Sequence, residues 1–499
     1  MGTLLFVIGI CSVFGAIGYF YSRGKVRGLQ DYIVARNSVN FALTTATFIA
    51  TGMGAWILFA PIETTINFGL VALIGYAIGG ASPLIAFWFL GSKMRQVLPQ
   101  GNTLAEFIQR RFGGISHVVI LVVMVFYMFV FLTAELTAIG QTIRLITPDI
   151  PMWLLASIIG FATTAYTSYG GLRASIFTDG IQFIIMIPVL IIIFGVAGSH
   201  FGGFVEISSQ LALRAQDKLD FTNQPGVETG IALIIAVLAA NLFHQGYWQR
   251  IFSAKDTAVL KKSLVVSSLV IIPMILATGF FGLIALSVSQ TSTGYPGIPA
   301  IALFQVVAVG LPDYIGLLLI VLAIALVMSS IDSLLNGIVS LAITNVSPNQ
   351  SNTTVLLRQS RFLTIAIVIP AILIASQELS VLYMFFIADL VAAGFIVPVF
   401  IGLYSPRTRG WMVVTSGFVG ILISLLFFPN PDWSSVIIPL LDSAHGNLMH
   451  SFLASLFVST GLIVIFQQCT HAFGTNKPFD FQTLQSQRFT KPPLTRSNS

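Results

Sequence analysis

A cluster of hydroxyl and carboxyl side chains lies inside one long apolar segment, residues 312–343. Its sequence is Ser329-Ser330-Ile331-Asp332-Ser333. On a helix, positions three and four residues apart share a face, so Ser329 faces the same way as Asp332 and Ser333. Hydroxyl, carboxylate and freed carbonyl oxygens are the ligands that hard cations prefer. Serines alone could equally bond back to their own helix or join two helices, but an aspartate among them favours a cation site.

A second segment places glycines in the middle of an apolar stretch, with the sequence Ala50-Thr51-Gly52-Met53-Gly54-Ala55-Trp56. Glycine weakens a helix, so Gly52 and Gly54 predict a helix that unwinds near the middle of the membrane. Unwound backbone exposes carbonyl groups that can hold a cation and turns helix ends toward a solute. The alternative is a small-residue face on which another helix packs.

Five of the 18 acidic residues lie in or at the edge of apolar segments. They are Glu63, Glu135, Asp179, Asp332 and Asp389. No Lys or Arg is expected deep in any of these segments, so the acids would need a bound cation or a proton. Alternatives remain: Asp179 could favour a helix dipole, Glu63 could be solvated, and Glu135 and Asp389 could be neutral carboxyls bonded between helices.

A third run, at the end of the apolar segment 228–250, combines polar and aromatic residues. It reads His244-Gln245-Gly246-Tyr247-Trp248-Gln249-Arg250. Aromatic residues and an arginine at a cytoplasmic helix end are common interfacial anchors, whereas His244, Gln245 and Tyr247 could bind a polar solute. With Trp56, Glu135 and Asp389, these three residues form the candidate substrate-binding or gating set.

The composition places the chain in a membrane. Of its 499 residues, 56% are hydrophobic and 8% are charged, whereas soluble domains carry about 25% charged residues. Cys11 and Cys469, at opposite ends, exclude a disulfide framework or a cysteine metal cluster. Basic residues are spread over many short loops, which argues against a nucleic-acid partner. The soluble segments hold no nucleophile–base pair or phosphate loop, so we expect neither an enzyme nor a cofactor.

The apolar segments predict an all-α polytopic protein of about thirteen transmembrane helices, in the inner or plasma membrane. They lie near residues 3–21, 40–66, 68–91, 116–142, 151–170, 175–198, 228–250, 263–289, 312–343, 362–377, 380–403, 411–428 and 450–468. With the N-terminus outside and the C-terminus inside, 21 of the 24 Lys and Arg residues fall on the cytoplasmic side. The chain is therefore expected to form one membrane domain, residues 1–470, followed by a disordered cytoplasmic tail, 471–499.

The motifs together resemble the sodium:solute symporter family, which includes sodium/proline and sodium/pantothenate symporters. The most specific match is Tyr169-Gly170-Gly171-Leu172-Arg173-Ala174 followed by Thr178-Asp179-Gly180-Ile181-Gln182. The segment around Gly52 looks like the first core helix of that family, and the Ser329–Ser333 cluster looks like its eighth. The likeness runs over roughly residues 1–430.

The resemblance implies a leucine-transporter-type fold with two inverted five-helix repeats, about 40–198 and 228–403. It also implies a sodium site between the first and eighth core helices. The ligands carried over are the carbonyls of Ala50, Met53 and Leu326 and the hydroxyls of Ser329 and Ser330. A second cation site, present in some relatives, would involve Ser329 together with Asp179, Asp332 and Ser333. Sodium would be the only metal ion, as coupling ion.

The chain departs from two branches of that family. Proline-type relatives carry an acid and a serine on the first core helix, where this chain has Gly52 and Gly54, and sugar-type relatives have polar residues where this chain has Ile57-Leu58-Phe59. The expected function is sodium-coupled symport of a small organic solute (an amino acid, carboxylate, urea or vitamin) by alternating access. A proton-coupled symporter of the same fold, or a membrane sensor with vestigial transport, remains an alternative.

Overall fold

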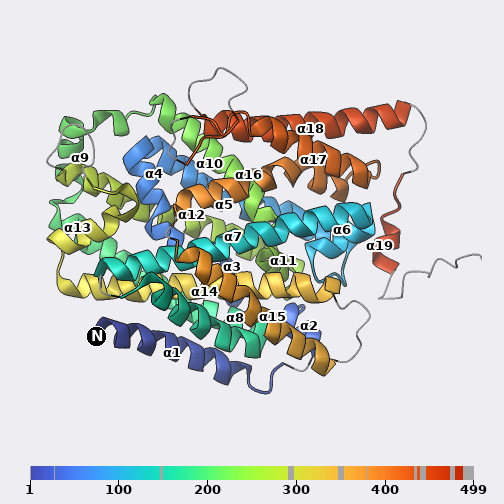
Figure 1. The fold of residues 1–499 in the computed structure, drawn as a ribbon, viewed down its shortest axis with the longest axis horizontal. Helices are drawn as coiled ribbons and strands as arrows, with labels where there is room; N and C mark the ends of the chain where they lie inside the picture. Colours follow the sequence, from blue (N-terminus) through green and yellow to red (C-terminus); the bar gives the residue numbers. More distant parts are fainter. Residues whose placement is uncertain are drawn as a thin grey trace, which may run out of the picture.

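The computed structural model is built of helices (Figure 1). It describes residues 2–26, 28–146, 150–289, 297–346, 353–377, 379–431, 435–438, 446–472 and 478–486. The helices that begin in the first half are α1 (Gly2–Ser22), α2 (Leu29–Ile33), α3 (Phe41–Gly52), α4 (Ala60–Phe68), α5 (Leu70–Val97), α6 (Leu104–Phe112), α7 (Gly114–Ile146), α8 (Met152–His200), α9 (Gly203–Arg214), α10 (Gln224–Leu242) and α11 (Gln245–Ser253). The later helices are α12 (Thr257–Val288), α13 (Ala302–Gly310), α14 (Asp313–Val346), α15 (Thr353–Ala375), α16 (Val381–Phe400), α17 (Gly410–Ser424), α18 (Leu448–Ala472) and α19 (Gln482–Ser486).

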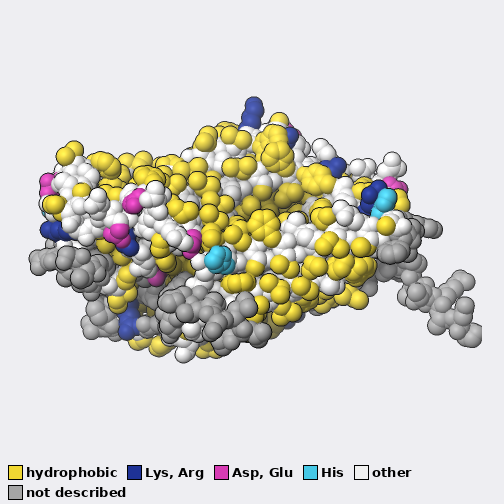
Figure 2. All heavy atoms as spheres, turned by 90° about the horizontal axis from the view of Figure 1, so that it is seen from above, with side chains coloured by type: hydrophobic (Ala, Val, Ile, Leu, Met, Phe, Trp, Pro, Cys, Tyr) yellow, Lys and Arg dark blue, Asp and Glu magenta, His cyan; other side chains and the backbone are white. Residues whose placement is uncertain are grey.

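Many of these helices match the dimensions of a lipid bilayer. Within the described ranges, ten are long and apolar enough to cross a membrane, or up to eleven if the bent pair Phe41–Gly52 and Ala55–Phe68 forms one span. Large hydrophobic side chains such as Phe20, Phe89 and Phe457 point outward and are 58–67% exposed. Figure 2 shows hydrophobic side chains over much of one face, with most visible acidic side chains near one end. The protein is a multi-pass membrane protein.

The predicted spans 151–170 and 175–198 correspond to two helices that meet at a kink and together make up the 49 residues of α8. At about 1.5 Å per residue, 49 helical residues are more than twice as long as a bilayer core is thick, which is enough for two spans. The helical path of α8 is broken at Gly171, where φ is 55° and ψ is −146°. A Cβ at Gly171 would lie 2.5 Å from the carbonyl oxygen of Tyr32, so glycine is required both by the backbone conformation and by this close approach. The predicted segment 411–428 corresponds to the shorter α17, and the total of thirteen spans stays a prediction.

The predicted break in the first core helix is confirmed by the structure. Helix α3 ends at Gly52, a 3₁₀ turn, η1, spans Ala55–Leu58, and α4 follows at Ala60. The two halves are bent by 59°. The backbone at Met53 is extended, with φ −103° and ψ 96°, so the break lies at the glycine-containing motif.

A second break, between α10 and α11, divides the predicted span 228–250. Helix α10 ends at Leu242, and His244 begins the short helix α11 by accepting a hydrogen bond at Nδ1 from the Gly246 N–H (3.0 Å). The indole of Trp248 folds back and donates to the Leu242 carbonyl (2.8 Å). Beyond this break, the residues from His244 to Arg250 are buried within the protein.

Part of the predicted disordered tail has a defined position. Residues 478–486 include α19, and the Phe479 N–H donates to the Pro406 carbonyl (2.9 Å). The ring of Phe479 lies 4.4 Å from the guanidinium carbon of Arg111 on α6. Residues 473–477 and 487–499 lie outside the described part of the chain.

Candidate functional site

The end of α3 provides backbone oxygens at the centre of the protein. The last carbonyls of a helix have no partner inside it. Here the Ile49 carbonyl accepts from the Met53 N–H (2.9 Å), and the Gly52 carbonyl accepts from the indole N–H of Trp56 (3.2 Å). Ala50 lies between them and is fully buried. The last turn of α3, with Ala50, therefore lies directly at the break, and two of its carbonyls accept hydrogen bonds from residues of the break.

Two unsatisfied oxygens face this break from neighbouring helices. The hydroxyl of Ser330 on α14 and Oε1 of Glu135 on α7 are buried, and neither has a hydrogen-bond partner among the described residues. Oε2 of Glu135 accepts from the Ala55 N–H at 2.7 Å. A Cβ at Gly54 would lie 1.9 Å from Glu135 Oε1 and 2.6 Å from Ser330 Oγ. Glycine at position 54 therefore lets both oxygens approach the unwound backbone.

The adjacent hydroxyl of Ser329 points to a different group. It donates to Oδ1 of Asp179 on α8 at 2.5 Å. Leu326, one turn earlier on α14, is fully buried, as is Met53 at the break. The predicted ligands Ala50, Met53 and Ser330 thus lie in one region. The hydroxyl of Ser329, in contrast, donates its hydrogen bond to Asp179.

Arg250 occupies the region predicted for a second cation. Its guanidinium Nη2 lies 2.9 Å from Asp179 Oδ2 and 2.6 Å from Ser333 Oγ, and both ion-pair side chains are 0% exposed. Further bonds run to Thr47 and Ser175, each at 2.9 Å. Thr47 also donates to Asp179. The interpretation of Arg250 as an interfacial anchor was therefore wrong, because its side chain is fully buried against Thr47, Asp179 and Ser333.

Asp332 has its own set of donors. Its Oδ1 accepts from Ser175 (2.7 Å) and Ser333 (3.2 Å), and its Oδ2 accepts from Tyr166 (2.8 Å) and Thr178 (3.3 Å). Each oxygen of this carboxylate thus has hydrogen-bond donors within the protein. Because Ser175 and Ser333 also contact Arg250, the two buried aspartates and the guanidinium form one continuous polar network.

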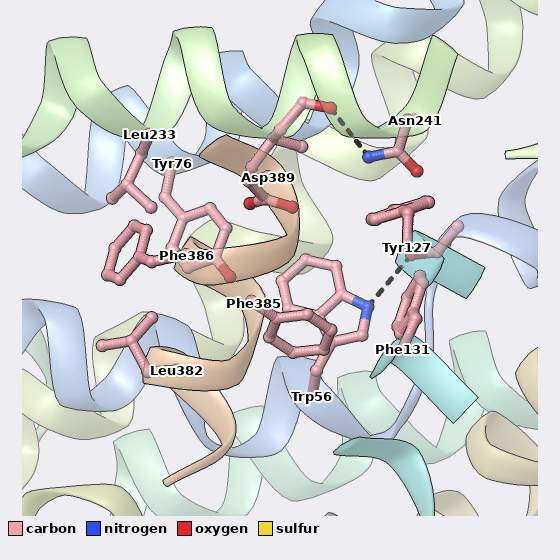
Figure 3. A pocket seen from close by; sticks show the side chains of 12 residues that line it. Trp56, Tyr76, Tyr127, Phe131, Leu233, Asn241, Leu382, Phe385, Phe386 and Asp389 are labelled. Carbon is pink, nitrogen blue, oxygen red and sulfur yellow. Dashed lines mark hydrogen bonds between the residues drawn. The ribbon is translucent and has the colours of Figure 1, made fainter. Parts of the chain in front are cut away.

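A separate cavity adjoins the broken helix, and aromatic rings surround a single carboxylate in it (Figure 3). The volume of this cavity is about 40 Å³, so its walls would have to move apart to admit an organic solute. The lining residues are Gly52, Trp56, Tyr76, Tyr127, Phe131, Leu233, Val237, Asn241, Leu382, Phe385, Phe386 and Asp389. Gly52 and Trp56 belong to the break itself, so any molecule in the cavity contacts the same segment that faces Ser330 and Glu135.

The predicted substrate-binding residues are distributed over this region. Trp56 and Asp389 line the cavity. The Tyr247 hydroxyl approaches the end of α3, since a Cβ at Gly52 would lie 2.3 Å from it. His244 packs its ring 6.1 Å from Tyr127 and 5.9 Å from Phe131, measured between centroids.

Gln245 does not line the cavity, and its side-chain amide bonds to the backbone at the start of α6. Its Oε1 accepts from the Leu104 N–H (3.2 Å), and its Nε2 donates to the Asn102 carbonyl (3.0 Å). Both contacts fix the segment that leads into α6. Gln245 is thus bonded to backbone away from the residues that line the cavity.

Most of the aromatic lining was missed by the sequence reasoning, although the spacing carries a signal. Tyr127, Phe131 and Glu135 are four residues apart on α7, and Phe385 is four residues before Asp389 on α16. Side chains at such intervals share one helix face. An aromatic–aromatic–acid stripe within an apolar helix would have pointed to the cavity wall. Tyr76 and Asn241 carry no comparable pattern.

The chain is similar in sequence to known membrane transporters. A sequence model of the sodium:solute symporter family matches residues 32–420. The spermidine transporter DUR31 of Candida albicans is 26% identical over 411 residues, which cover 81% of this chain and 76% of that protein. The urea active transporter of Saccharomyces cerevisiae is 22% identical, and the match covers 54% of this chain but only 38% of the relative.

The fold is shared with solved transporters. The structure of a Na⁺-coupled sialic acid symporter in a substrate-bound outward-open state has a TM-score of 0.78 at 16% identity, covering 95% of this chain and 98% of the other. The structure of the transporter MhsT in complex with L-phenylalanine has a TM-score of 0.54, and the match covers 86% of this chain and 98% of MhsT. The structure therefore has the leucine-transporter-type fold expected from the sequence, and the chain belongs to the sodium:solute symporter family.

Proposed function

We propose that this protein is a secondary active transporter of the plasma membrane that moves a small organic solute together with sodium by alternating access. The observation that carries the proposal is the pair of unsatisfied oxygens, Ser330 Oγ and Glu135 Oε1, beside the carbonyl end of α3. A buried polar atom without a partner is costly. A sodium ion would provide the missing partner for both oxygens at once.

The ion would hold the broken helix against its neighbours. Ser330 is on α14, Glu135 is on α7, and the carbonyls of Ala50 and Met53 belong to the break. A cation bound among them fixes η1 relative to both helices. Because Gly52 and Trp56 also line the cavity, fixing η1 would order one wall of the solute site. Inward opening would then release the ion into a cytoplasm low in sodium.

The driving force is the electrochemical gradient. One elementary charge that crosses 100 mV supplies about 2.3 kcal/mol, before the sodium concentration ratio is added. We further propose a single coupling ion. In the candidate second site, Asp179 and Ser333 already contact the guanidinium of Arg250, which takes the place that a second ion would need beside them.

The test is uptake of labelled solutes into proteoliposomes, with sodium or potassium outside and equal pH on both sides. The relatives are named for solutes as different as spermidine, urea and proline, so the panel has to include all three types. Accumulation of a solute only with sodium would support symport. Equal uptake in both salts that rises with an imposed proton gradient would establish the proton-coupled alternative, with Glu135 as the first residue to test. No uptake of any solute, with specific binding retained, would favour the sensor.

A further inference from the structure

The cavity described above has a marked imbalance of charge. Asp389 is its single ionisable acid, and no Lys or Arg is among the lining residues that the structure describes. The Asp389 side chain is 6% exposed, and no hydrogen bond to it is found within the described residues. Figure 3 shows its carboxyl group pointing into the pocket toward the indole of Trp56. A buried carboxylate without a partner requires either a proton or a positive group to offset the cost of leaving water, and the walls of the cavity decide between the two.

The remaining walls are suited to a positive group. Trp56, Tyr76, Tyr127, Phe131, Phe385 and Phe386 surround the same space. The rings of Trp56 and Tyr76 stack with centroids 5.4 Å apart, and those of Phe131 and Phe385 meet edge to face at 5.0 Å. Aromatic faces carry partial negative charge and attract ammonium groups, most strongly where water is excluded.

The polar atoms point to the same chemistry. Asn241 donates its Nδ2 to the Val237 carbonyl (2.8 Å), which leaves its Oδ1 to accept a hydrogen bond. The Tyr76 and Tyr127 hydroxyls can also accept. Together with Asp389, these atoms provide acceptors for the N–H groups of an amine.

We propose that the solute bound in this cavity is an organic cation, a small amine or quaternary ammonium compound whose positive group lies between Asp389 and the ring of Trp56. The inference rests on the transport function proposed above. A neutral solute such as urea would leave Asp389 without a counter-charge, and a carboxylate would be repelled by it. The cation would also contact Trp56 on η1, the segment that the coupling ion is proposed to fix, so solute and ion would stabilise one arrangement of the break.

The first experiment uses the unmodified protein in proteoliposomes. Choline is compared with its uncharged isostere, in which carbon replaces the ammonium nitrogen, as a competitor of labelled putrescine uptake. The two competitors have the same shape, so a difference between them reports the charge. We expect choline to compete at least about tenfold better, the ratio that a desolvated cation–π contact provides. Equal competition would overturn the proposal.

The second experiment tests Asp389 directly. Asp389→Asn preserves the shape of the side chain and removes its charge, and it should weaken putrescine binding by about tenfold or more, because a hydrogen bond to a charged group is lost. Asp220→Asn is the matched control, because Asp220 is exposed and, within the described part of the chain, its carboxylate bonds only to Thr222 on its own loop. Unchanged putrescine affinity in Asp389→Asn would refute the role of this carboxylate.

The outcomes separate the two proposals. Sodium-dependent uptake of urea, proline or glucose without any amine uptake would refute the organic-cation inference and leave symport intact. Amine uptake that is equal in sodium and potassium would refute sodium coupling and leave the assignment of the cavity intact. If Asp389→Asn does not fold, the competition experiment on the unmodified protein decides.

Discussion

Ser329 and Ser330 are neighbours on α14, yet their hydroxyl groups belong to different sites. Ser329 donates to Asp179 at 2.5 Å and so joins the network around Arg250. Ser330 faces Gly54 and Glu135 and has no partner among the described residues. Successive residues on a helix point about 100° apart, so one short motif contributes both to a charge network and to the proposed ion site.

The two serines should therefore respond differently to removal of their hydroxyls. Ser330→Ala should raise the sodium concentration for half-maximal uptake by about tenfold, the effect of losing one ligand interaction of roughly 1.4 kcal/mol, with little change in expression. Ser340→Ala is the matched control, because that buried hydroxyl on α14 bonds the Gly337 carbonyl of its own helix (2.8 Å). An unaltered sodium dependence in Ser330→Ala would remove Ser330 from the site.

Gly54 should not tolerate even a methyl group. In Gly54→Ala the new Cβ would lie 1.9 Å from Glu135 Oε1 and 2.6 Å from Ser330 Oγ, so these oxygens would have to separate. We expect sodium-driven uptake to fall to background, because the proposed ion position is filled. Gly195→Ala, on α8, has no neighbouring atom within 4 Å of its Cβ and should keep full activity. Normal sodium-driven uptake by Gly54→Ala would mean that the ion does not bind at this break.

The buried ion pair makes a prediction about stability. Removing one partner of such a pair leaves an uncompensated charge, at a cost of about 3–5 kcal/mol. Arg250→Met should therefore lower the unfolding midpoint strongly, and the double variant Arg250→Met/Asp179→Asn should recover part of the loss. Thermal unfolding in detergent measures both.

A partly exposed ion pair provides the comparison for that experiment. Arg173 lies 2.6 Å from Asp31, with the two side chains 28% and 29% exposed. Arg173→Met should cost less than about 1 kcal/mol, because water screens such pairs. A double variant at positions 250 and 179 that is no more stable than Arg250→Met would show that the arginine acts through contacts other than Asp179.

The ordered part of the tail should depend on Arg111. This guanidinium donates to the carbonyls of Gly402 (3.1 Å) and Ser405 (2.7 Å) and lies against the ring of Phe479. Burial lowers the pKa of Arg111 to about 10, so the group is charged at neutral pH.

Loss of this cation–π contact should release the segment. In Phe479→Ala, limited proteolysis within 478–486 should be about fivefold faster, corresponding to a contact of roughly 1 kcal/mol. The exposed Gln482 provides the control variant Gln482→Ala. Equal cleavage rates in the two variants would show that α19 is held by its other contacts, such as Gln485 with the Gln96 carbonyl (3.1 Å).

The sequence was most informative where one short motif determines local backbone. The glycines at 52 and 54 predicted the break after α3, because glycine weakens any helix in which it lies. The order of motifs predicted the fold through resemblance. Hydropathy located the apolar segments before and after Gly171 but could not show that the two helices meet there directly, at a kink.

The sequence could not predict features that depend on contacts between helices far apart along the chain. Arg250 has the sequence neighbours of an interfacial anchor, and its inward position follows from the break at His244 and from Asp179 on a helix far away in the sequence. The cavity lining likewise joins η1, α5, α7, α10 and α16. Periodicity indicates which residues share a face of one helix, but it does not say which faces meet.

The separation of Asp179 and Arg250 along the chain has a consequence for biosynthesis. The two residues are 71 positions apart, and a ribosome adding about 5–20 residues per second needs roughly 4 to 14 seconds to make that stretch. The helix that carries Asp179 therefore enters the membrane before its arginine exists. During that interval the aspartate must be solvated or protonated, and the network can assemble only after α11 has folded inward.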